Sequence, residues 1–264
     1  EKLKTFENPE QKKEFKERTG KIMRRFLALG VVLVLLQLIA VKYTGFIIEN
    51  VNSVLTSFGK GVISVKDIIA PLGCSYYTFT MISYLADIYR GKIKPQKNYL
   101  KYLLFVSYFP QIIQGPIPRY GELSDQFFKG YKFSFPAVRD GIIRVIWGVF
   151  KKMVVAEPLG VFVATAYGDY ADKSSLALML AAVFYSIQIY ADFSGYTDIV
   201  SGVSECFGIK LPKNFERPFF ARTIPEFWRR WHISLSSWFR EYVFYALSSS
   251  KALLKLNRNA RKVF

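Results

Sequence analysis

Long apolar runs without charge are the feature that most constrains how this chain can fold. Residues 26–41 read FLALGVVLVLLQLIAV, with Gln37 as the only polar side chain. Residues 174–191 read SSLALMLAAVFYSIQIYA and form a second uncharged run. A helix needs about 20 mostly apolar residues to cross ~30 Å of hydrocarbon, a length the first run reaches with the apolar residues just past Lys42. The runs predict two membrane-spanning helices, against the alternative of core helices in a large soluble protein.

Composition narrows the class of protein further. Of the 264 residues, 51% are hydrophobic, and 37 Lys and Arg against 20 Asp and Glu give a net charge of +17. So much apolar surface excludes a disordered chain, and a simple nucleic-acid-binding protein does not need long uncharged runs. With two cysteines and one histidine, the sequence excludes a disulfide-stapled scaffold and predicts that no metal is bound by Cys or His clusters.

Several other apolar segments are interrupted. Residues 68–89 are rich in Ser, Thr and Tyr, and prolines and a glycine break residues 107–118, which predicts a re-entrant or kinked segment lining an interior. Residues 141–168 read as two short apolar pieces, split by Lys151-Lys152 and by Glu157-Pro158. We therefore expect an all-α, polytopic transmembrane fold with many short, tilted or broken helices.

Basic residues predict the orientation in the membrane, because short basic loops stay on the cytoplasmic side. The turn 169–173 is net acidic and is placed outside. Attraction to anionic lipid headgroups then explains the positive charge without nucleic acid. The basic segments that we place inside are 1–25, 90–101, 209–230 and 251–264. The expected domains are a charged cytoplasmic flank, a membrane-embedded domain and a basic cytoplasmic segment, at 1–25, 26–250 and 251–264.

Two aspartates follow the second apolar run. Asp192 and Asp198 are separated by a stretch that contains Ser194 and Thr197, and Gly195 permits close backbone approach. Ionisable side chains at membrane depth are costly, so they indicate a functional site with a partner. The alternative, which the sequence leaves open, is that both aspartates lie at a helix end and cap it or pair with a nearby arginine.

The segment Ile224–Tyr245 reads as one amphipathic helix. Thr223 is the expected N-cap, and Glu226 completes a capping box. Aromatic and apolar residues at spacings of three and four would form one face, which favours packing or a membrane interface over a cofactor site. The residues of this face are Trp228, Trp231, Leu235 and Trp238.

His232 is the only histidine and the candidate proton acceptor. A neutral imidazole can take a proton from a hydroxyl group and pass it on. Arg229 and Arg230 would lower its pKa and favour the neutral form. The alternative is a structural histidine. A pair with Cys74 or Cys206 is a further possibility, although inert buried thiols fit the sequence better.

Three stretches together resemble the membrane-bound O-acyltransferase family, in its bacterial alginate O-acetyltransferase-like branch. They are PLGCSYYTFTMISYLADIYRG at 71–91, YFPQIIQGPIPRYGEL at 108–123 and the long run from QIYADFSGYTD to WRRWHISLSSWFREYVF that starts at Gln188. The resemblance covers roughly residues 68–245. A combination of motifs of this length is far more specific than any single one.

The resemblance implies a multi-pass enzyme of the bacterial cytoplasmic membrane with a central tunnel. A cytoplasmic thioester donor, acetyl-CoA or an acyl-carrier protein, would supply an acyl group, expected to be acetyl, to hydroxyls of an extracytoplasmic polysaccharide or other cell-envelope polymer. No tightly bound cofactor is implied, and partner acyltransferase proteins and membrane lipids are. The family's second histidine lies tens of residues downstream of the Trp-His-x-Ser motif. We therefore expect the C-terminal part of the domain to be missing, and residues 246–250 (ALSSS) depart from the family's usual turn.

The resemblance also assigns roles to residues. His232 falls on the Trp-His-x-Ser histidine and is the expected catalytic residue. The residues expected to bind substrate or line the tunnel are Asp192, Ser194, Asp198, Gln111, Gln114, Asn214, Arg217, Trp231 and Ser234. Three alternatives stay open: D-alanyl transfer to teichoic acid, a transporter or channel subunit of an export machine, and a scaffold for soluble partners.

Overall fold

The computed structural model describes residues 9–64 and 70–250, and every element in these residues is helical. The all-α prediction is therefore confirmed. The chain forms two compact units, Glu1–Val106 and Ser107–Phe264, each with its own packing. The predicted basic segment 251–264 and the first eight residues of the predicted cytoplasmic flank lie outside the described residues.

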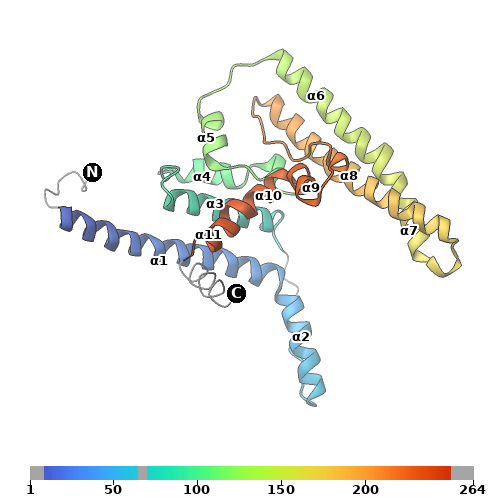
Figure 1. Ribbon diagram of the computed structural model, residues 1–264, viewed down its shortest axis with the longest axis horizontal. Coiled ribbons are helices and arrows are strands. Elements are labelled where there is room, and N and C mark those ends of the chain that lie inside the picture. The colour runs from blue at the N-terminus through green and yellow to red at the C-terminus, as the bar shows by residue number, and fades with distance from the viewer. Residues whose placement is uncertain (1–8, 65–69, 251–264) are drawn as a thin grey trace, which may run out of the picture. The chain divides into compact units, whose positions relative to one another are not determined.

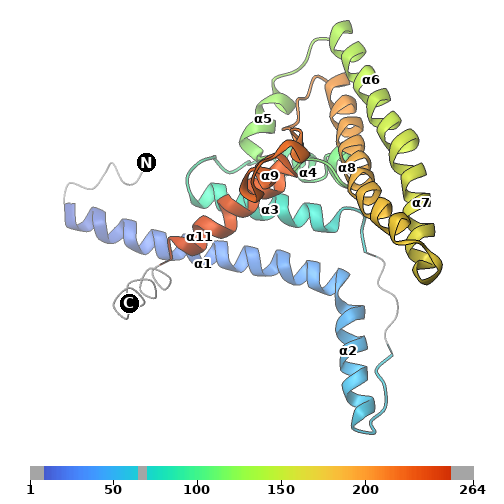
Figure 2. The ribbon, with the colours of Figure 1, turned by 45° about the vertical axis from the view of Figure 1, so that its right-hand side comes forward.

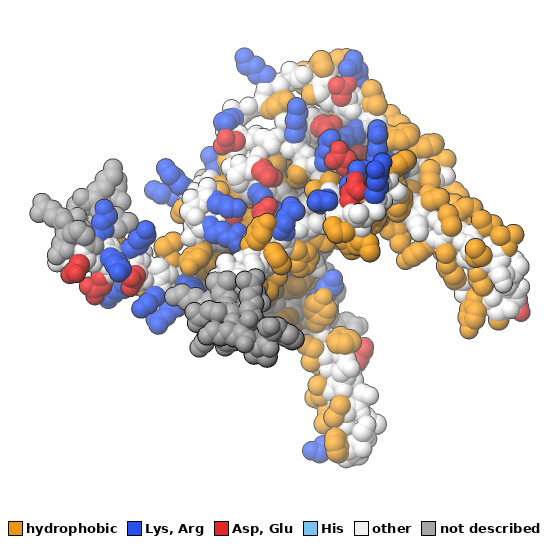
Figure 3. Space-filling model, in the orientation of Figure 1, with side chains coloured by type: hydrophobic (Ala, Val, Ile, Leu, Met, Phe, Trp, Pro, Cys, Tyr) orange, Lys and Arg blue, Asp and Glu red, His pale blue; other side chains and the backbone are white. Residues whose placement is uncertain are grey.

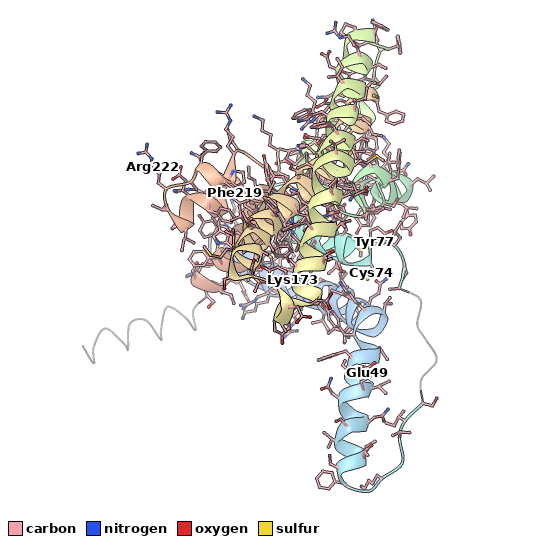
Figure 4. The ribbon with its side chains drawn as sticks, turned by 90° about the vertical axis from the view of Figure 1, so that its right-hand side faces the viewer. Glu49, Cys74, Tyr77, Lys173, Phe219 and Arg222 are labelled. Carbon is pink, nitrogen blue, oxygen red and sulfur yellow. The ribbon has the colours of Figure 1, made fainter. Side chains whose placement is uncertain are left out.

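The first unit is built on one long helix. α1 carries the charged residues from Glu10 on and the whole apolar run 26–41 without a break. α3 packs against it, because Gly30 leaves room for Leu85 and Lys42 Nζ donates a hydrogen bond to Ser75 Oγ at 3.2 Å. The helices of this unit are α1 (Pro9–Lys42), α2 (Thr44–Ser57), α3 (Cys74–Tyr89) and α4 (Tyr99–Val106) (Figure 1). Residues Cys74 and Tyr77 mark the start of α3 in Figure 4.

The second unit is built on a helical hairpin. α6 (Phe135–Phe150) continues through a π-helical turn, Lys151–Ala156, into α7 (Glu157–Gly168). After a tight turn that contains Lys173, α8 (Ser175–Cys206) runs back beside them (Figures 1, 2 and 4). The shorter helices of the unit are α5 (Tyr120–Phe128), α9 (Ile224–Arg230), α10 (Ile233–Trp238) and α11 (Tyr245–Ser248), with a second π-helical turn, Phe239–Phe244, between α10 and α11.

The hairpin corrects the prediction for residues 141–168. Two separate apolar pieces were expected there, but the backbone stays helical from Phe135 to Gly168. Lys151 and Lys152 do not interrupt the helix, because they find acidic partners on α8. Pro158 is tolerated because the π-helical turn just before it relaxes the usual hydrogen-bond ladder.

Glycines let α6 and α8 pack closely. A Cβ atom on Gly141 would lie 2.6 Å from the carbonyl oxygen of Gly202, and one on Gly148 would lie 2.5 Å from that of Gly195. The two pairs lie about two helical turns apart on both helices, as expected for antiparallel neighbours. Only glycine allows backbones to approach this closely, as in the small-residue interfaces of membrane helices.

Two described helices, α1 and α8, are long and apolar enough to cross a membrane. Of their most apolar 18-residue windows, 0% and 11% of the residues are buried within the described chain. Within the described residues, neither helix has the high burial that is typical of a core helix in a soluble protein. Figure 3 shows hydrophobic side chains along the outer surface of the α7 and α8 end. This surface suits contact with lipid or with other apolar segments.

Residues 107–118 are irregular, as predicted from their prolines. They contain a 3₁₀ turn, Phe109–Gln111, followed by a turn at 112–114 and irregular backbone up to α5. The segment is largely buried, and Gln111, Pro116 and Pro118 are almost completely so. Irregular backbone that is buried in protein is the kind that a membrane protein tolerates. The re-entrant path itself stays a prediction.

Candidate functional site

His232 lies at a break between two short helices. Its backbone has φ +43°, in the left-handed region, and separates α9 from α10. A left-handed residue cannot continue a right-handed helix, and for a non-glycine residue it is costly. The predicted single helix Ile224–Tyr245 is therefore wrong. A further departure follows at the π-helical turn Phe239–Phe244.

The start of α9 is close to the prediction. Thr223 Oγ1 accepts a hydrogen bond from the Glu226 N–H at 3.3 Å, so Thr223 is the N-cap. Glu226 Oε2 accepts from the N–H of Arg222 at 2.9 Å, one residue earlier than in a standard capping box. The Arg222 side chain points outward, and Phe219 lies on the 3₁₀ turn just before it (Figure 4). These contacts and the Arg230 ion pair to Glu226 hold the helix that leads into His232.

Asn214 connects the histidine to the preceding loop. Its Oδ1 lies 3.1 Å from His232 Nδ1, and it also accepts from the Ser234 N–H at 3.2 Å and the Ser234 hydroxyl at 2.7 Å. The Ser234 Oγ in turn accepts from the N–H of Ile117 at 3.0 Å. The irregular segment 107–118 thus supports the site through Ile117.

The environment of His232 keeps its imidazole neutral. Burial lowers the pKa of His232 from 6.5 to about 4, because a charged ring would lose its hydration. The prediction that Arg229 and Arg230 cause this shift is not supported. Phe193 of α8 meets the ring edge-on, with ring centroids 4.7 Å apart. At neutral pH the imidazole is therefore a base rather than a cation.

Aromatic rings surround the residue before the histidine. Trp231 stacks on Phe227 with ring centroids 5.6 Å apart, and it meets Phe215 edge-on at 5.0 Å. Trp238 lies beyond the break and packs with Tyr242 instead. The predicted single aromatic face is therefore wrong, because the helix break separates its two halves. Trp231 is a packing residue that fixes the position of its neighbour.

A polar cavity of about 190 Å³ lies between the hairpin and the loop that carries Asn214. Its wall combines basic, acidic and hydroxyl side chains with two aromatic rings. The lining residues are Arg144, Lys151, Tyr190, Ser194, Thr197, Asp198, Ser201, Lys213, Asn214 and Phe215. The predicted site residues Ser194, Asp198 and Asn214 thus share one cavity, and a contact through Asn214 joins it to His232. A cavity of this size holds a small polar group rather than a whole coenzyme.

The charges of this wall are paired, except for that of Lys213, which has no ion pair within the described residues. Asp198 accepts from Arg144 Nε at 3.1 Å and from Lys151 Nζ, and Lys152 Nζ pairs with Asp192. Both aspartates lie inside α8, so the alternative that placed them at a helix end is wrong. The alternative that they form ion pairs is confirmed, with lysines as well as an arginine. Pairing is what allows charged side chains in an apolar helix.

Six predicted site residues do not line the cavity, namely Gln111, Gln114, Arg217 and Asp192, together with Trp231 and Ser234 beside His232. Gln111 is completely buried, and its amide atoms have no hydrogen-bond partner within the described ranges. Gln114 and Arg217 do not line the cavity either, and Arg217 has a left-handed backbone with φ +48°. Asp192 faces Lys152 instead.

The sequence reasoning missed all three basic cavity residues, Arg144, Lys151 and Lys213. It also did not assign Tyr190, Thr197, Ser201 and Phe215 to the site. Lys151-Lys152 was treated as an interruption of an apolar stretch. A signal was present, because two lysines in one apolar segment and two aspartates in another predict mutual pairing. Within the described residues, 9–64 and 70–250, no group of three His, Cys, Asp or Glu side chains could hold a metal ion.

Fold and site together define a helical membrane-type protein whose neutral histidine adjoins a charged polar cavity. The profile of MBOAT, the membrane-bound O-acyltransferase family, matches residues 93–259, and this chain belongs to that family. The match includes both His232 and the whole cavity wall. Members of this family are membrane proteins, in agreement with the two helices that could span a bilayer.

Similar proteins act on different polymers, as their names state. The chain is 36% identical over 228 residues to the probable alginate O-acetylase AlgI of Azotobacter vinelandii, covering 86% of this chain and 45% of that protein. It is 32% identical over 268 residues to the peptidoglycan O-acetyltransferase of Helicobacter pylori, covering 91% and 50%. It is 34% identical over 180 residues to the teichoic acid D-alanyltransferase of Bacillus subtilis, covering 67% and 46%. The chain spans about half the length of these relatives.

Proposed function

We propose that this protein transfers an acyl group from a cytoplasmic thioester donor to a hydroxyl of an extracytoplasmic polysaccharide or other cell-envelope polymer. The observation that carries the proposal is the half-buried, neutral imidazole of His232, held beside a polar cavity in the region that matches the O-acyltransferase family. A neutral imidazole next to a polar cavity is what deprotonation of a hydroxyl requires.

The reaction needs one proton acceptor. The acceptor hydroxyl gives its proton to the imidazole of His232 while its oxygen attacks the thioester carbonyl carbon. A carbon–oxygen bond forms, the carbon–sulfur bond breaks, and the imidazolium returns the proton to the departing sulfur. The products are an ester and a thiol, with no net change in protons. General-base assistance of this kind contributes ~10²–10⁴-fold to the rate.

Acetyl is the acyl group that we favour, because two of the three similar proteins are named for acetyl transfer. D-alanyl transfer to teichoic acid is the alternative, supported by the third. The donor is acetyl-CoA or an acyl-carrier protein, and no tightly bound cofactor is proposed. Partner acyltransferase proteins would receive or pass on the acyl group at the outer face.

The cavity is proposed as one part of a tunnel through a multi-pass protein of the bacterial cytoplasmic membrane. Ser194, Asp198 and Asn214 belong to its wall. Gln111 and Gln114 would extend the polar wall along the segment 107–118, and Arg217 would lie at the cytoplasmic mouth. The acidic turn 169–173 then faces outside, with the basic loops inside near anionic lipid.

The test is His232→Gln in the intact protein, expressed at its normal level in its own cells. The ester-linked acyl content of the envelope polymers, measured by mass spectrometry, should fall to the level of a strain without the gene. Phe193→Leu is the matched control, because it changes the ring that packs on the imidazole but keeps the base. Polymer acylation at the wild-type level in the His232→Gln strain would refute the proposed role.

The same strains distinguish the transporter alternative, which the charged residues within α8 favour. An export subunit would move polymer or precursor across vesicles without any change in acylation. Loss of polymer or precursor flux with unchanged acyl content would support that alternative. Separately, the mass of the group added to the isolated polymer identifies it as acetyl or D-alanyl.

A further inference from the structure

Asn214 presents its side-chain oxygen, rather than its nitrogen, to three neighbours. One of them is the backbone N–H of Ser234, at 3.2 Å, and a backbone N–H can only donate. The atom that it meets must therefore be Oδ1. The Ser234 hydroxyl accepts from the Ile117 N–H, so its own hydrogen is free to point to Asn214, at 2.7 Å. The backbone contact excludes the flipped amide, and the hydroxyl contact is consistent with the same orientation.

The third neighbour is the imidazole. Because Oδ1 can only accept, the contact of 3.1 Å requires that His232 Nδ1 carries the hydrogen. The ring is neutral, so its other nitrogen, Nε2, keeps a free lone pair. Among residues 9–64 and 70–250 the structure gives Nε2 no hydrogen-bond partner. The orientation of one amide thus decides which nitrogen is the base.

The backbone of Asn214 supports the same arrangement. Its carbonyl oxygen accepts from the Ile233 N–H at 2.9 Å, directly after the left-handed His232. Two residues on, the Glu216 N–H donates to the Arg230 carbonyl at 2.9 Å, before the break. Backbone hydrogen bonds therefore hold the loop to the residues on both sides of His232. A strained backbone conformation persists only where surrounding contacts fix it in this way.

The amide nitrogen of Asn214, Nδ2, takes part in none of these contacts. Asn214 is 4% exposed and lines the polar cavity, and its Nδ2 has no hydrogen-bond partner within the described part of the chain. Two cations of the same wall, Arg144 and Lys151, pair with Asp198, whereas Lys213 has no ion pair within the described residues. A buried N–H group without a partner is rare in native proteins and indicates a missing one. A substrate oxygen in the cavity would complete the set.

We propose that Asn214 is the positioning residue of His232: its Oδ1 fixes the tautomer with hydrogen on Nδ1, so that Nε2 accepts the substrate proton, while its Nδ2 donates to an oxygen of the substrate group in the cavity. The role of Nε2 rests on the acyl-transfer function proposed above. The tautomer and the orientation of the amide do not.

The tautomer can be measured directly. Protein labelled with ¹⁵N-histidine, in detergent or lipid, gives imidazole nitrogen signals, and those that vanish in His232→Gln belong to His232. At pH 7 we expect a protonated Nδ1 and an unprotonated Nε2. The opposite pattern, with hydrogen on Nε2, would overturn the proposal whatever the protein's activity.

Two substitutions test the roles of Oδ1 and Nδ2 of Asn214 separately. Asn214→Asp keeps an oxygen for Nδ1 and removes the donor, so the tautomer should persist, the imidazole pKa should rise by at least about one unit, and KM should rise about tenfold. Asn214→Leu removes both atoms, so the tautomer should no longer be fixed and kcat should fall by at least about 10²-fold. An unchanged KM in Asn214→Asp would contradict the proposed role of Nδ2 as a donor to the substrate. An unchanged kcat in Asn214→Leu would contradict the proposed role of Oδ1 in positioning His232.

Asn98→Asp is the matched control for the chemical change. Asn98 Oδ1 accepts from the Lys101 N–H at the start of α4, a position where aspartate caps equally well, and its side chain is exposed. Its KM, kcat and imidazole signals should equal those of the wild type. If His232→Gln retains full acyl transfer, the acyl-transfer role of His232 fails, and the NMR result for Asn214 still decides the positioning.

Discussion

α1 and α8 pass the same test of length and apolarity, yet they differ in every other respect. No described residue of α1 is buried, and its apolar run has one polar side chain, Gln37. α8 buries a stripe of small and hydroxyl residues that includes Ser194, Gly195, Thr197 and Ser201. Hydropathy finds both helices, but the small and acidic residues indicate which one builds a site.

The charges of the two helices differ as well. Those of α1 lie outside its apolar run, between Glu10 and Arg25 and at Lys42, where water or lipid headgroups can solvate them. Those of α8 lie in the second half of the helix, after its apolar run, and pair with Arg144, Lys151 and Lys152. α8 therefore depends on the helix beside it, whereas the apolar run of α1 needs only an apolar surrounding.

The largest difference between the helices should come from removing a charge. Asp198→Leu leaves the ammonium group of Lys151 without its carboxylate partner. We expect the free energy of unfolding to fall by about 3 kcal/mol, because removing one member of a buried ion pair leaves the other charge uncompensated. The double variant with Lys151→Met should recover much of the loss. Gln37→Leu in α1 should change stability by less than about 0.5 kcal/mol. Thermal unfolding in detergent measures all three, and equal effects of Asp198→Leu and Gln37→Leu would erase the contrast.

A smaller effect on stability is expected when a glycine is replaced by alanine, with opposite signs at the α6–α8 contact and in α1. Alanine at Gly148 would bring a Cβ atom to 2.5 Å from the Gly195 carbonyl oxygen, which should cost about 1–3 kcal/mol. Gly20 in α1 has nothing within 4 Å of such an atom, so Gly20→Ala should stabilise by up to about 1 kcal/mol through helix propensity. The shifts in unfolding midpoint should therefore be negative for the first and positive for the second. A positive shift for Gly148→Ala would mean that α6 and α8 are not in contact there.

The smallest effect on stability at neutral pH is expected from His232, whose ring packs on Phe193 of α8. Its folded-state pKa is about 4 and its unfolded value is 6.5, so between these values the unfolded chain binds more protons. Stability should be constant above pH 6.5 and fall as the pH drops towards 4. Unfolding midpoints across this window should show a slope that His232→Gln reduces. An identical slope in the variant would assign the pH dependence to other groups.

Part of this fold could be predicted from local sequence. The two helices that are long and apolar enough to span a membrane follow from uncharged runs, and the irregular segment 107–118 follows from its prolines. The break at His232 could not be predicted, since residues 224–245 keep helical spacing throughout. It depends on Asn214, which is remote in sequence and accepts from Ile233 and Ser234. A tertiary contact here overrides a local preference.

The site was predicted where residue type carries the chemistry, as for His232, and where the family resemblance assigns a role, as for Asn214. His232, Ser194, Asp198 and Asn214 were named from the sequence, and the structure brings the last three to one cavity wall. Arg144 and Lys151 were missed because their role depends on the register between α6 and α8, which the sequence does not state. Gln111 shows the converse, because a suggestive residue type lies buried away from that wall.

The π-helical turn Lys151–Ala156 gives the hairpin an unusual sensitivity to length. Adjacent side chains of an α-helix point ~100° apart, but the wider turn lets Lys151 and Lys152 both reach acids on α8. Deleting one residue there would restore an ordinary helix and swing all of α7 by the same ~100° about its axis. Gly160 would then turn away from Gln188, which it now nearly touches. Substitutions are therefore far easier for this stretch to absorb than a single-codon deletion.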